Sequence, residues 1–395
     1  MIRHLAAWIG YPLAEWYQGR TIRAKAAELR REWKIPFAER LLLRQRQLAA
    51  ALARAGANVP YYRDLFRQHR FDPARVADDP RWLADLPYLT KDIVREQGSR
   101  LLSTAHPIAE LQPRQTGGST GPSTIIFYSP DALDWTAAVN LVALEWAGKR
   151  PQCREVHLAS RFPEEFAWRD RVKEHLKGAV LNRVNIFTDS FDPRSLEQVW
   201  RRLSRLRPHL IQGHPSTLYA LAVHLGECQL DARGAFQVFE STGEVLDAKK
   251  RRKISETFGC DVVDRFGNAE FGIVAYERLG TPDHSLALFD GIVWPETRSH
   301  ESGQHELVFT ALRNDAMPLV RYRTGDLGEL WTTASGFSIR NIAGRVHDLV
   351  RIAGRHYPTH YLQDLLDRIG GIDEFQVEQR PDGTLVLWLV VGDSG

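Results

Sequence analysis

The sequence predicts an α/β protein: a large N-terminal region with parallel strands covered by helices, a smaller β subdomain, and then a shortened α+β C-terminal domain. Strand-like and helix-like stretches alternate between residues 155 and 266, which is typical of a parallel sheet covered on both faces. From about residue 285 the pattern becomes β-rich, with Gly- and Asp-containing turns. At 395 residues the chain is also too long for one ordinary core, because a domain of ordinary size holds about 150 residues.

Composition and cysteine usage narrow the class of protein. Hydrophobic residues make up 43% of the chain and charged residues 26%, a balance typical of a soluble globular protein. Cys153, Cys228 and Cys260 are widely spaced and odd in number, which argues against a disulfide framework and a paired C-x-x-C metal site. The N-terminus lacks the long apolar region of a signal peptide, and no run reaches the roughly eighteen apolar residues that span a bilayer. These features predict a cytoplasmic location.

Residues 1–70 are expected to form a basic helical extension packed on the large domain. They hold 14 Lys and Arg against 5 Asp and Glu, a net charge of +9, so the rest of the chain carries +3 minus +9, or −6. Such a segment can contact anionic lipid, an acidic protein or nucleic acid. The interpretation that we favour is a solvated helical face with Trp8 and Trp16 packed inward. No stretch has the spacing of a groove-reading module, so we expect no nucleic-acid partner, while weak peripheral membrane contact stays open.

The first elements can be read in order along the chain. Leucines and alanines recur at helical spacing from 37 to 55, after Pro36 and before Gly56, which predicts a helix. Thr90 is placed to cap a short helix near 90–97. Beyond a Gly-rich loop, strands are expected at 155–160, 179–187, 209–213, 236–241 and 261–266, and helices at 164–176, 193–206, 215–225 and 247–258.

The remaining stretches complete the division into domains. β stretches at 285–294, 305–312, 319–331 and 337–342 suggest a smaller sheet or distorted barrel attached to the α/β part. Past Gly344 we expect two short β stretches, a helix near 358–369, and two strands joined at Asp382-Gly383, a strong hairpin signal. The predicted domains are 1–70; 71–343, which is α/β to about 284 and β-rich over 285–343; and a partial C-terminal domain at 344–395.

The stretch "QTGGSTGPST" (115–124) is a candidate phosphate-binding loop. Successive backbone N–H groups in a Gly-rich turn can form a nest for phosphate oxygens, and Ser and Thr hydroxyls add donors. The loop has neither the spacing of a Walker A motif nor the order of a dinucleotide-binding motif. Taken alone, the motif favours a plain mobile loop over a phosphate-binding one.

Two later stretches carry residues suited to a nucleotide. "DRFGNAEFG" (264–272) follows a predicted strand and holds Phe266, whose ring can stack on a base, and Glu270, whose carboxylate can hold a divalent cation. The alternative is a core Phe and a solvated Glu. "YRTGDLGEL" (322–330) places Asp326 in a turn, where it can accept from ribose hydroxyls or fix its own turn.

Five motifs in order, "TGGSTG", "STGE", "DRFGNAEFG", "YRTGDL" and "GRVHDLVRIAGRHYP", together resemble the adenylate-forming superfamily of acyl-coenzyme A synthetases and nonribosomal adenylation domains. The nearest branch is the phenylacetate-coenzyme A ligase-like group, which includes capsular polysaccharide biosynthesis and coenzyme F390 synthetase-like proteins. The likeness covers nearly the whole chain.

The resemblance implies that ATP and a small carboxylic acid, expected to be aryl, give an acyl-adenylate, after which the acyl group passes to coenzyme A or another acceptor. It implies that ATP is bound by Thr116, Gly117, Gly118, Ser119, Thr120, Gly121, Thr242, Gly243, Glu244, Phe266, Gly267, Asn268, Asp326 and Arg345. By the same likeness Glu270 binds Mg²⁺, and Thr116, Glu270 and Arg345 are the catalytic residues. The acyl pocket is expected at His214, Pro215 and Gly243, although His214 can equally be a buried neutral histidine. His347 and Asp348 take the hinge positions.

Departures from the family pattern leave a second hypothesis open. Pro122 follows Gly121 directly and the usual loop lysine is missing, His347 replaces the pivot aspartate, and no lysine follows Gly344 although the family carries a late catalytic one. The activity is therefore expected to be reduced, or the chain is a degenerate nucleotide-binding protein with a scaffold or regulatory role in a polysaccharide or natural-product pathway. We expect no structural zinc, since the region after Phe271 has no cysteine and few histidines. The sequence leaves the oligomeric state open, a dimer included.

Overall fold

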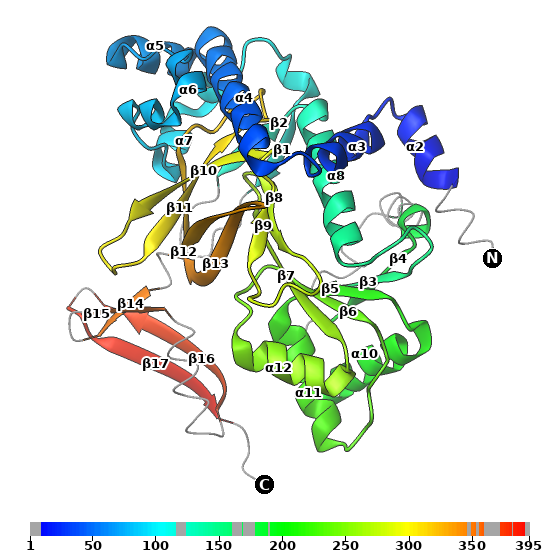
Figure 1. Ribbon diagram of the computed structural model, residues 1–395. Helices are drawn as coiled ribbons and strands as arrows, with labels where there is room; N and C mark the ends of the chain where they lie inside the picture. Colours follow the sequence, from blue (N-terminus) through cyan, green and yellow to red (C-terminus); the bar gives the residue numbers. More distant parts are fainter. Residues whose placement is uncertain are drawn as a thin grey trace.

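A single hydrogen-bonded sheet connects most of the strands in the computed structural model (Figure 1). The structure describes residues 9–115, 124–159, 168, 178–188, 190–345, 349–352, 355–358, 372–380 and 382–391. Within these residues the sheet has 11 strands in the order β10-β11-β12-β13-β9-β8-β7-β6-β5-β3-β4. Strands β3 to β7 pair in parallel, so the chain must cross over between neighbouring strands in this part of the sheet.

The parallel half of the sheet has helices on both faces, as predicted. Leu210 and Val238 point into one hydrophobic core together with α8, whereas Ile211 and Phe239 point into a second core formed with the helices that follow these strands. This alternation is what a period of two residues produces in a strand buried on both sides. The elements are α8 (Pro130–Trp146), β3 (Glu155–Ala159), β4 (Arg183–Phe187), α10 (Pro193–Leu206), β5 (Leu210–Gly213), α11 (Pro215–Glu227), β6 (Val238–Ser241) and α12 (Ala248–Phe258).

The long strand β7 (Asp261–Asn268) joins the parallel half to an antiparallel half. Its first residues pair in parallel with β6 and its last residues pair antiparallel with β8. The β-rich segment therefore continues the same sheet, where the sequence suggested an attached smaller sheet or barrel. Its strands are β8 (Gly272–Glu277), β9 (Leu286–Leu288), β10 (Val293–Ser299), β11 (His305–Ala311), β12 (Tyr322–Thr333) and β13 (Gly336–Arg345).

Helices from the first hundred residues cover the antiparallel half. The predicted helix after Pro36 is confirmed and ends slightly later than expected, and the Thr90 hydroxyl accepts a hydrogen bond from the N–H of Ile93 at 3.3 Å, as its capping role requires. A short hairpin follows. The elements are α2 (Tyr11–Tyr17), α3 (Ile22–Glu32), α4 (Phe37–Asn58), α5 (Pro60–His69), α6 (Arg75–Asp78), η2 (Pro80–Asp85), α7 (Lys91–Gln97), η3 (Gly98–Leu101), η4 (Ile108–Glu110), β1 (Gln112–Gln115) and β2 (Ile125–Tyr128).

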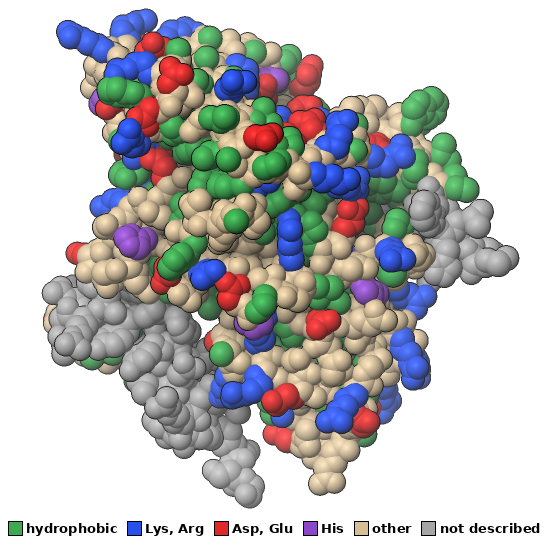
Figure 2. Space-filling view, in the orientation of Figure 1, with side chains coloured by type: hydrophobic (Ala, Val, Ile, Leu, Met, Phe, Trp, Pro, Cys, Tyr) green, Lys and Arg blue, Asp and Glu red, His purple; other side chains and the backbone are tan. Residues whose placement is uncertain are grey.

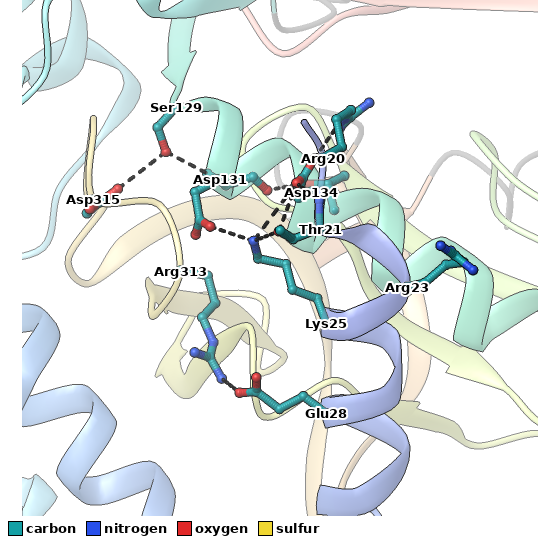
Figure 3. A network of polar contacts seen from close by, with 12 residues as sticks. Arg20, Thr21, Arg23, Lys25, Glu28, Ser129, Asp131, Asp134, Arg313 and Asp315 are labelled. Carbon is teal, nitrogen blue, oxygen red and sulfur yellow. Dashed lines mark hydrogen bonds and ion pairs between the residues drawn. The ribbon is translucent and has the colours of Figure 1, made fainter. Parts of the chain in front are cut away.

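A polar network fastens α3 to α8 (Figure 3). The buried carboxylate of Asp134 accepts from the backbone N–H of Thr21 at 2.7 Å and from Arg20 Nε at 2.6 Å. Lys25 bridges the same two helices, because its Nζ lies 2.5 Å from Asp131 Oδ1. Burial works to raise the pKa of Asp134, but the hydrogen bonds from Thr21 and Arg20 prevail and hold that pKa below its ordinary value. The N-terminal segment is therefore fixed to the body of the molecule by an ionised carboxylate.

The expectation that Trp16 packs inward is wrong. Its side chain is 78% exposed on α2, and the neighbouring Tyr17 is 85% exposed. The inward face of this short helix is instead taken by Tyr11, which packs against the core, and by the buried Glu15. Trp8 lies outside the described residues.

The last part of the chain forms two small hairpins apart from the large sheet. They are β14 (Leu349–Ile352) with β15 (Arg355–Pro358), and β16 (Ile372–Gln379) with β17 (Leu385–Val391). The predicted turn at Asp382-Gly383 is confirmed, since Gly383 has φ +86° and Asp382 Oδ1 accepts from the N–H of Thr384 at 2.9 Å. Within the described residues no helix is long and apolar enough to cross a membrane.

Some expectations on secondary structure were wrong, and others are not tested. The strand expected over 179–187 is a strand only in β4, because residues 178–181 are helical. Most of the helix expected near 164–176 and nearly all of that near 358–369 lie outside the described residues. The proposed domain boundaries stay a prediction.

Candidate active site

A cleft of about 1730 Å³ opens between α12, β7 and the end of β13. Its walls come from the loop after β6, from α12, and from strands of the antiparallel half. Six residues singled out in the sequence line it although they come from distant motifs: Gly243, Glu244, Phe266, Gly267, Asp326 and Arg345. The fold therefore brings four of the five motifs to one place.

Asp326 sits on β12 where the pairing with β13 brings it opposite Arg345. Arg345 Nε lies 3.5 Å from Asp326 Oδ1, and the N–H of Asp326 donates to the hydroxyl of Thr324 at 3.0 Å. Burial is the largest cause that raises the pKa of Asp326 to about 6; the charge of Arg345 works against it, and the nearby carboxylate of Glu270 adds to it. Asp326 is thus a buried carboxyl group that changes its charge near neutral pH.

Glu270 is held in the tight connection between β7 and β8. The side-chain oxygen of Asn268 accepts from the N–H of Phe271 at 3.0 Å, which fixes the turn, and Tyr128 donates to the backbone oxygen of Ala269 at 2.8 Å. Tyr322 donates its hydroxyl proton to Glu270 Oε1 at 2.8 Å. Burial and the charge of Glu270 raise the pKa of Tyr322, so this hydroxyl stays a donor to the carboxylate. Asn268 therefore has a structural task in the motif besides its predicted contact with ATP.

Phe266 and Gly267 shape the wall of the cleft beside this turn. The ring of Phe266 is nearly buried and tilts against Phe309, with 6.4 Å between ring centroids. The ring belongs to the core and also lines the cleft, and its stacking on a base stays a prediction. At Gly267 a Cβ atom would lie 2.4 Å from the backbone oxygen of Gly272. No side chain fits there without moving the strand pair.

The loop that holds Thr242, Gly243 and Glu244 packs against the turn between β5 and α11. Ser216 donates to Glu244 through its hydroxyl at 2.8 Å and through its N–H at 3.1 Å. The ring of His214 lies against Gly243, where a Cβ atom would approach it to 2.6 Å and where φ is +84°. His214 Nδ1 lies 3.5 Å from Glu244 Oε1 and makes no hydrogen bond. Pro215 is buried in the first turn of α11, and the N–H of Thr242 donates to the backbone oxygen of Gly213 at 3.1 Å.

Comparison with known proteins tests the family resemblance independently of this geometry. No protein-family model matches the sequence. The chain is 28% identical over 373 residues to the phenylacetate-coenzyme A ligase of Escherichia coli (strain K12), and the match covers 85% of this chain and 81% of the relative. It is 20% identical over 348 residues to the protein CapK of Staphylococcus aureus, covering 85% of this chain and 75% of the relative.

A solved structure shows the same fold. It is 2-hydroxyisobutyryl-CoA ligase in the postadenylation state in complex with R3-HIB-AMP, which matches with a TM-score of 0.70 at 20% identity and covers 91% of this chain and 80% of that chain. In sequence the chain thus resembles the phenylacetate-coenzyme A ligases and CapK, and it shares the fold of 2-hydroxyisobutyryl-CoA ligase. The α/β fold that the sequence predicted is also the fold of this ligase.

Two predicted parts of the adenylate-forming site lie outside the described residues. They are the phosphate loop of Thr116, Gly117, Gly118, Ser119, Thr120 and Gly121, and the hinge residues His347 and Asp348. The described strands β1 and β2 flank the loop in sequence and pair antiparallel up to Gln115 and Ile125. The roles of the phosphate loop and of the hinge residues stay predictions.

Sequence reasoning missed the side chains that support the candidate site. Tyr322 opens the "YRTGDL" stretch and binds Glu270, yet it was read only as a strand residue. Glu306 is 1% exposed on β11 and accepts from Arg323 Nε at 2.9 Å and from the N–H of Gly325 at 3.2 Å. An acidic residue at the start of an otherwise apolar strand, in "HELVFTAL", was the available signal, because a buried carboxylate requires partners.

The described residues contain no group of three or more His, Cys, Asp or Glu side chains that could hold a metal ion by themselves. Cys153, Cys228 and Cys260 are all free thiols. Any divalent ion at Glu270 thus needs other ligands, such as water and phosphate oxygens, to complete its coordination.

Proposed function

We propose that this chain uses ATP to activate a small aryl carboxylic acid as an acyl-adenylate, and then passes the acyl group to coenzyme A. The observation that carries the proposal is the convergence of Phe266, Asp326 and Arg345 on one cleft. Glu270 lies close enough for its charge to raise the pKa of Asp326. The first reaction joins a carboxylate oxygen to the α-phosphorus of ATP and releases pyrophosphate. The second transfers the acyl group to a thiol and releases AMP.

The nucleotide is proposed to lie along the wall formed by β7 and β12. Phe266 is placed beside the adenine, the carboxylate of Asp326 accepts from the ribose hydroxyls, and Arg345 lies next to that carboxylate, where its charge can face a phosphate. Bringing a carboxylate to a triphosphate gathers negative charge, so fixed cations at this point lower the barrier. Holding both reactants in one cleft also removes the entropic cost of their encounter.

Glu270 suits the magnesium ion that such a reaction uses. Mg²⁺ keeps several waters and is commonly held by one or two carboxylates together with substrate phosphates, and Glu270 offers a buried carboxylate with one oxygen already oriented by Tyr322. When bound, the ion neutralises phosphate charge. The protein side of this site is the turn fixed by Asn268, which sets the direction of the carboxylate.

The acyl group is proposed to lie near His214, Pro215 and Gly243. The phenylacetate-coenzyme A ligases among the relatives support an aryl acid, and the flat ring of His214 against Gly243 gives a surface on which a second ring can pack. The Thr116–Gly121 loop is proposed to grip the β- and γ-phosphates.

Pyrophosphate release tests the first step. The full chain is mixed with ATP, Mg²⁺ and panels of aryl, fatty and amino acids, and the same assay is run on Glu270→Gln and on the matched control Glu227→Gln, an exposed residue at the end of α11. Aryl acids should stimulate release, and Glu270→Gln should lower kcat about 10²-fold or more, while the control stays unchanged. Silence of the unsubstituted chain across all three panels would overturn the proposal.

Calorimetry distinguishes the degenerate nucleotide-binding alternative from the ligase. Titration with ATP alone reports binding whether or not an acid is activated. Saturable ATP binding without pyrophosphate release would favour the scaffold or regulatory role, whereas binding together with release supports the ligase.

A further inference from the structure

Four large apolar side chains in and just before the helix α2 face solvent. Ile9, Leu13, Trp16 and Tyr17 are 51%, 57%, 78% and 85% exposed. At about 100° per residue, these positions fall within an arc of about 100° on one side of the helix. Single exposed apolar residues are common on protein surfaces, but a contiguous group of this kind marks a contact surface. We call these four residues the α2 stripe.

The opposite side of α2 is anchored, so the stripe is held outward. Glu15 is buried and accepts from the backbone N–H of Arg23 at 2.7 Å, and Tyr11 packs against the core. Burial, with the charge of Glu15, raises the pKa of Tyr11 to about 12, so its hydroxyl stays protonated. The next helix is in turn tied to α8 through Asp134 (Figure 3). The stripe therefore sits on a fixed base.

Basic side chains lie beside the stripe on and after α3. Arg31 and Lys34 are exposed, and the side chains of Arg23 and Arg30 are 54% and 42% exposed while they pair with Glu15 and Glu145. The acidic residues Glu15 and Glu32 of the same segment are both 7% exposed, whereas the side chain of Glu28 is 40% exposed and pairs with Arg313. In the space-filling view, hydrophobic side chains stand at the surface over α2 at the upper right, with basic side chains nearby (Figure 2).

We propose that the α2 stripe rests on the surface of an anionic lipid bilayer. Trp and Tyr prefer the boundary between headgroups and acyl chains, because their rings are apolar and their N–H and O–H groups are polar. Exposed Arg and Lys side chains beside an apolar helix face add attraction to lipid phosphates. With seven residues, α2 is far too short to cross a bilayer and lies on it.

The area of the stripe argues against a second copy of the chain as the occupant. Weighted by exposed fraction, four such side chains offer on the order of 450 Å². A stable protein complex buries about 800 Å² on each partner. A lipid surface requires no such minimum, because insertion strength grows with each apolar group and each cation added.

Co-sedimentation with vesicles tests the proposal on the full chain. The vesicles contain either phosphatidylcholine alone or phosphatidylcholine with about one third phosphatidylglycerol, and the variants are Trp16→Ser and Leu13→Ser. The matched control is Trp331→Ser, which removes another tryptophan that is 48% exposed, on β12. We expect binding to the anionic vesicles only, weakened about tenfold by Trp16→Ser, weakened by high salt, and unchanged in the control.

Three results would overturn the inference. The chain could stay in the supernatant with anionic vesicles, Trp16→Ser could bind as tightly as the unsubstituted chain, or sedimentation velocity could show a dimer that Leu13→Ser abolishes, which would assign the stripe to self-association. Thermal unfolding of each variant checks that the fold is kept. Because the stripe lies outside the cleft, none of these outcomes depends on whether the chain activates an acid.

Discussion

The charge of Asp326 is decided by its surroundings. An aspartate in water loses its proton near pH 3.8, whereas burial beside Glu270 raises the pKa of Asp326 to about 6 despite the guanidinium of Arg345. The folded chain therefore holds this proton more tightly than the unfolded chain does. Between about pH 4 and pH 6 the unfolded state releases the proton first, so this group makes the fold less stable as the pH rises through that window.

The affinity for ATP should depend on the same titration, but it should rise with pH where the stability falls. If the Asp326 carboxylate accepts from ribose hydroxyls, affinity for ATP falls as the pH drops below about 6, and at about pH 5 only about one tenth of the groups are ionised. Calorimetric titration with ATP between pH 5 and pH 7.5 measures this. Asp326→Asn should bind ATP more weakly and should lack the pH dependence that comes from the Asp326 carboxyl group. The titration of the ATP phosphates affects both proteins equally. Parallel pH profiles for the two would contradict the assignment.

The connection between β7 and β8 is an element whose geometry depends on one glycine. Gly267 lies opposite Ile273, and the backbone oxygen of Gly272 comes so close that a Cβ atom at 267 would be 2.4 Å from it. The same turn carries Glu270, which Asn268 and Tyr322 hold in place. A change in this strand pair thus reaches the candidate metal ligand.

Gly267→Ala should destabilise the chain by about 1–3 kcal/mol, because the added methyl group forces backbone atoms apart. Gly226→Ala is the matched control, since Gly226 is in helix α11, where the nearest neighbour of a Cβ atom is the flexible end of Lys253 at 3.4 Å. There alanine should be neutral or slightly stabilising. Urea unfolding measures both, and equal midpoints for the two variants would show that the close approach is relaxed at no cost.

Across the whole molecule, a buried ionic cluster ties the N-terminal helices to the antiparallel half of the sheet. Asp290, after β9, accepts from Arg40 Nε at 3.0 Å and from Arg44 Nε at 2.9 Å, and Arg44 also binds Glu32 at 2.7 Å. Both arginines and Asp290 are only 2% exposed at the side chain. Their charges compensate one another in a place that water does not reach.

Asp290→Asn should lower the free energy of unfolding by about 3–5 kcal/mol, because it leaves two buried guanidinium groups without their shared counter-ion. The control is Glu197→Gln, which breaks an exposed pair with Arg201 on α10 and should cost less than about 1 kcal/mol. Thermal and chemical unfolding compare the two. A loss for Asp290→Asn no larger than that of the control would mean that water or other groups replace the carboxylate.

The repeating patterns of the chain were enough to predict its elements. The helix after Pro36, the Thr90 cap and the alternating strands and helices from 193 to 266 are confirmed, because helical spacing, capping and buried strands are set by neighbouring residues. The cleft around Phe266, Asp326 and Arg345 could be anticipated only through a family resemblance, since the residues are far apart in sequence.

Tertiary structure decided what local patterns leave open. An apolar face on a helix looks the same in sequence whether it meets the core or water, so Trp16 was expected inside and is 78% exposed. The two halves of the sheet read as separate in sequence, but β7 joins them because one long strand can pair in parallel on one edge and antiparallel on the other. The partners of buried charges, such as Tyr322 with Glu270 and Glu306 with Arg323, come from distant segments and are chosen only when the chain packs.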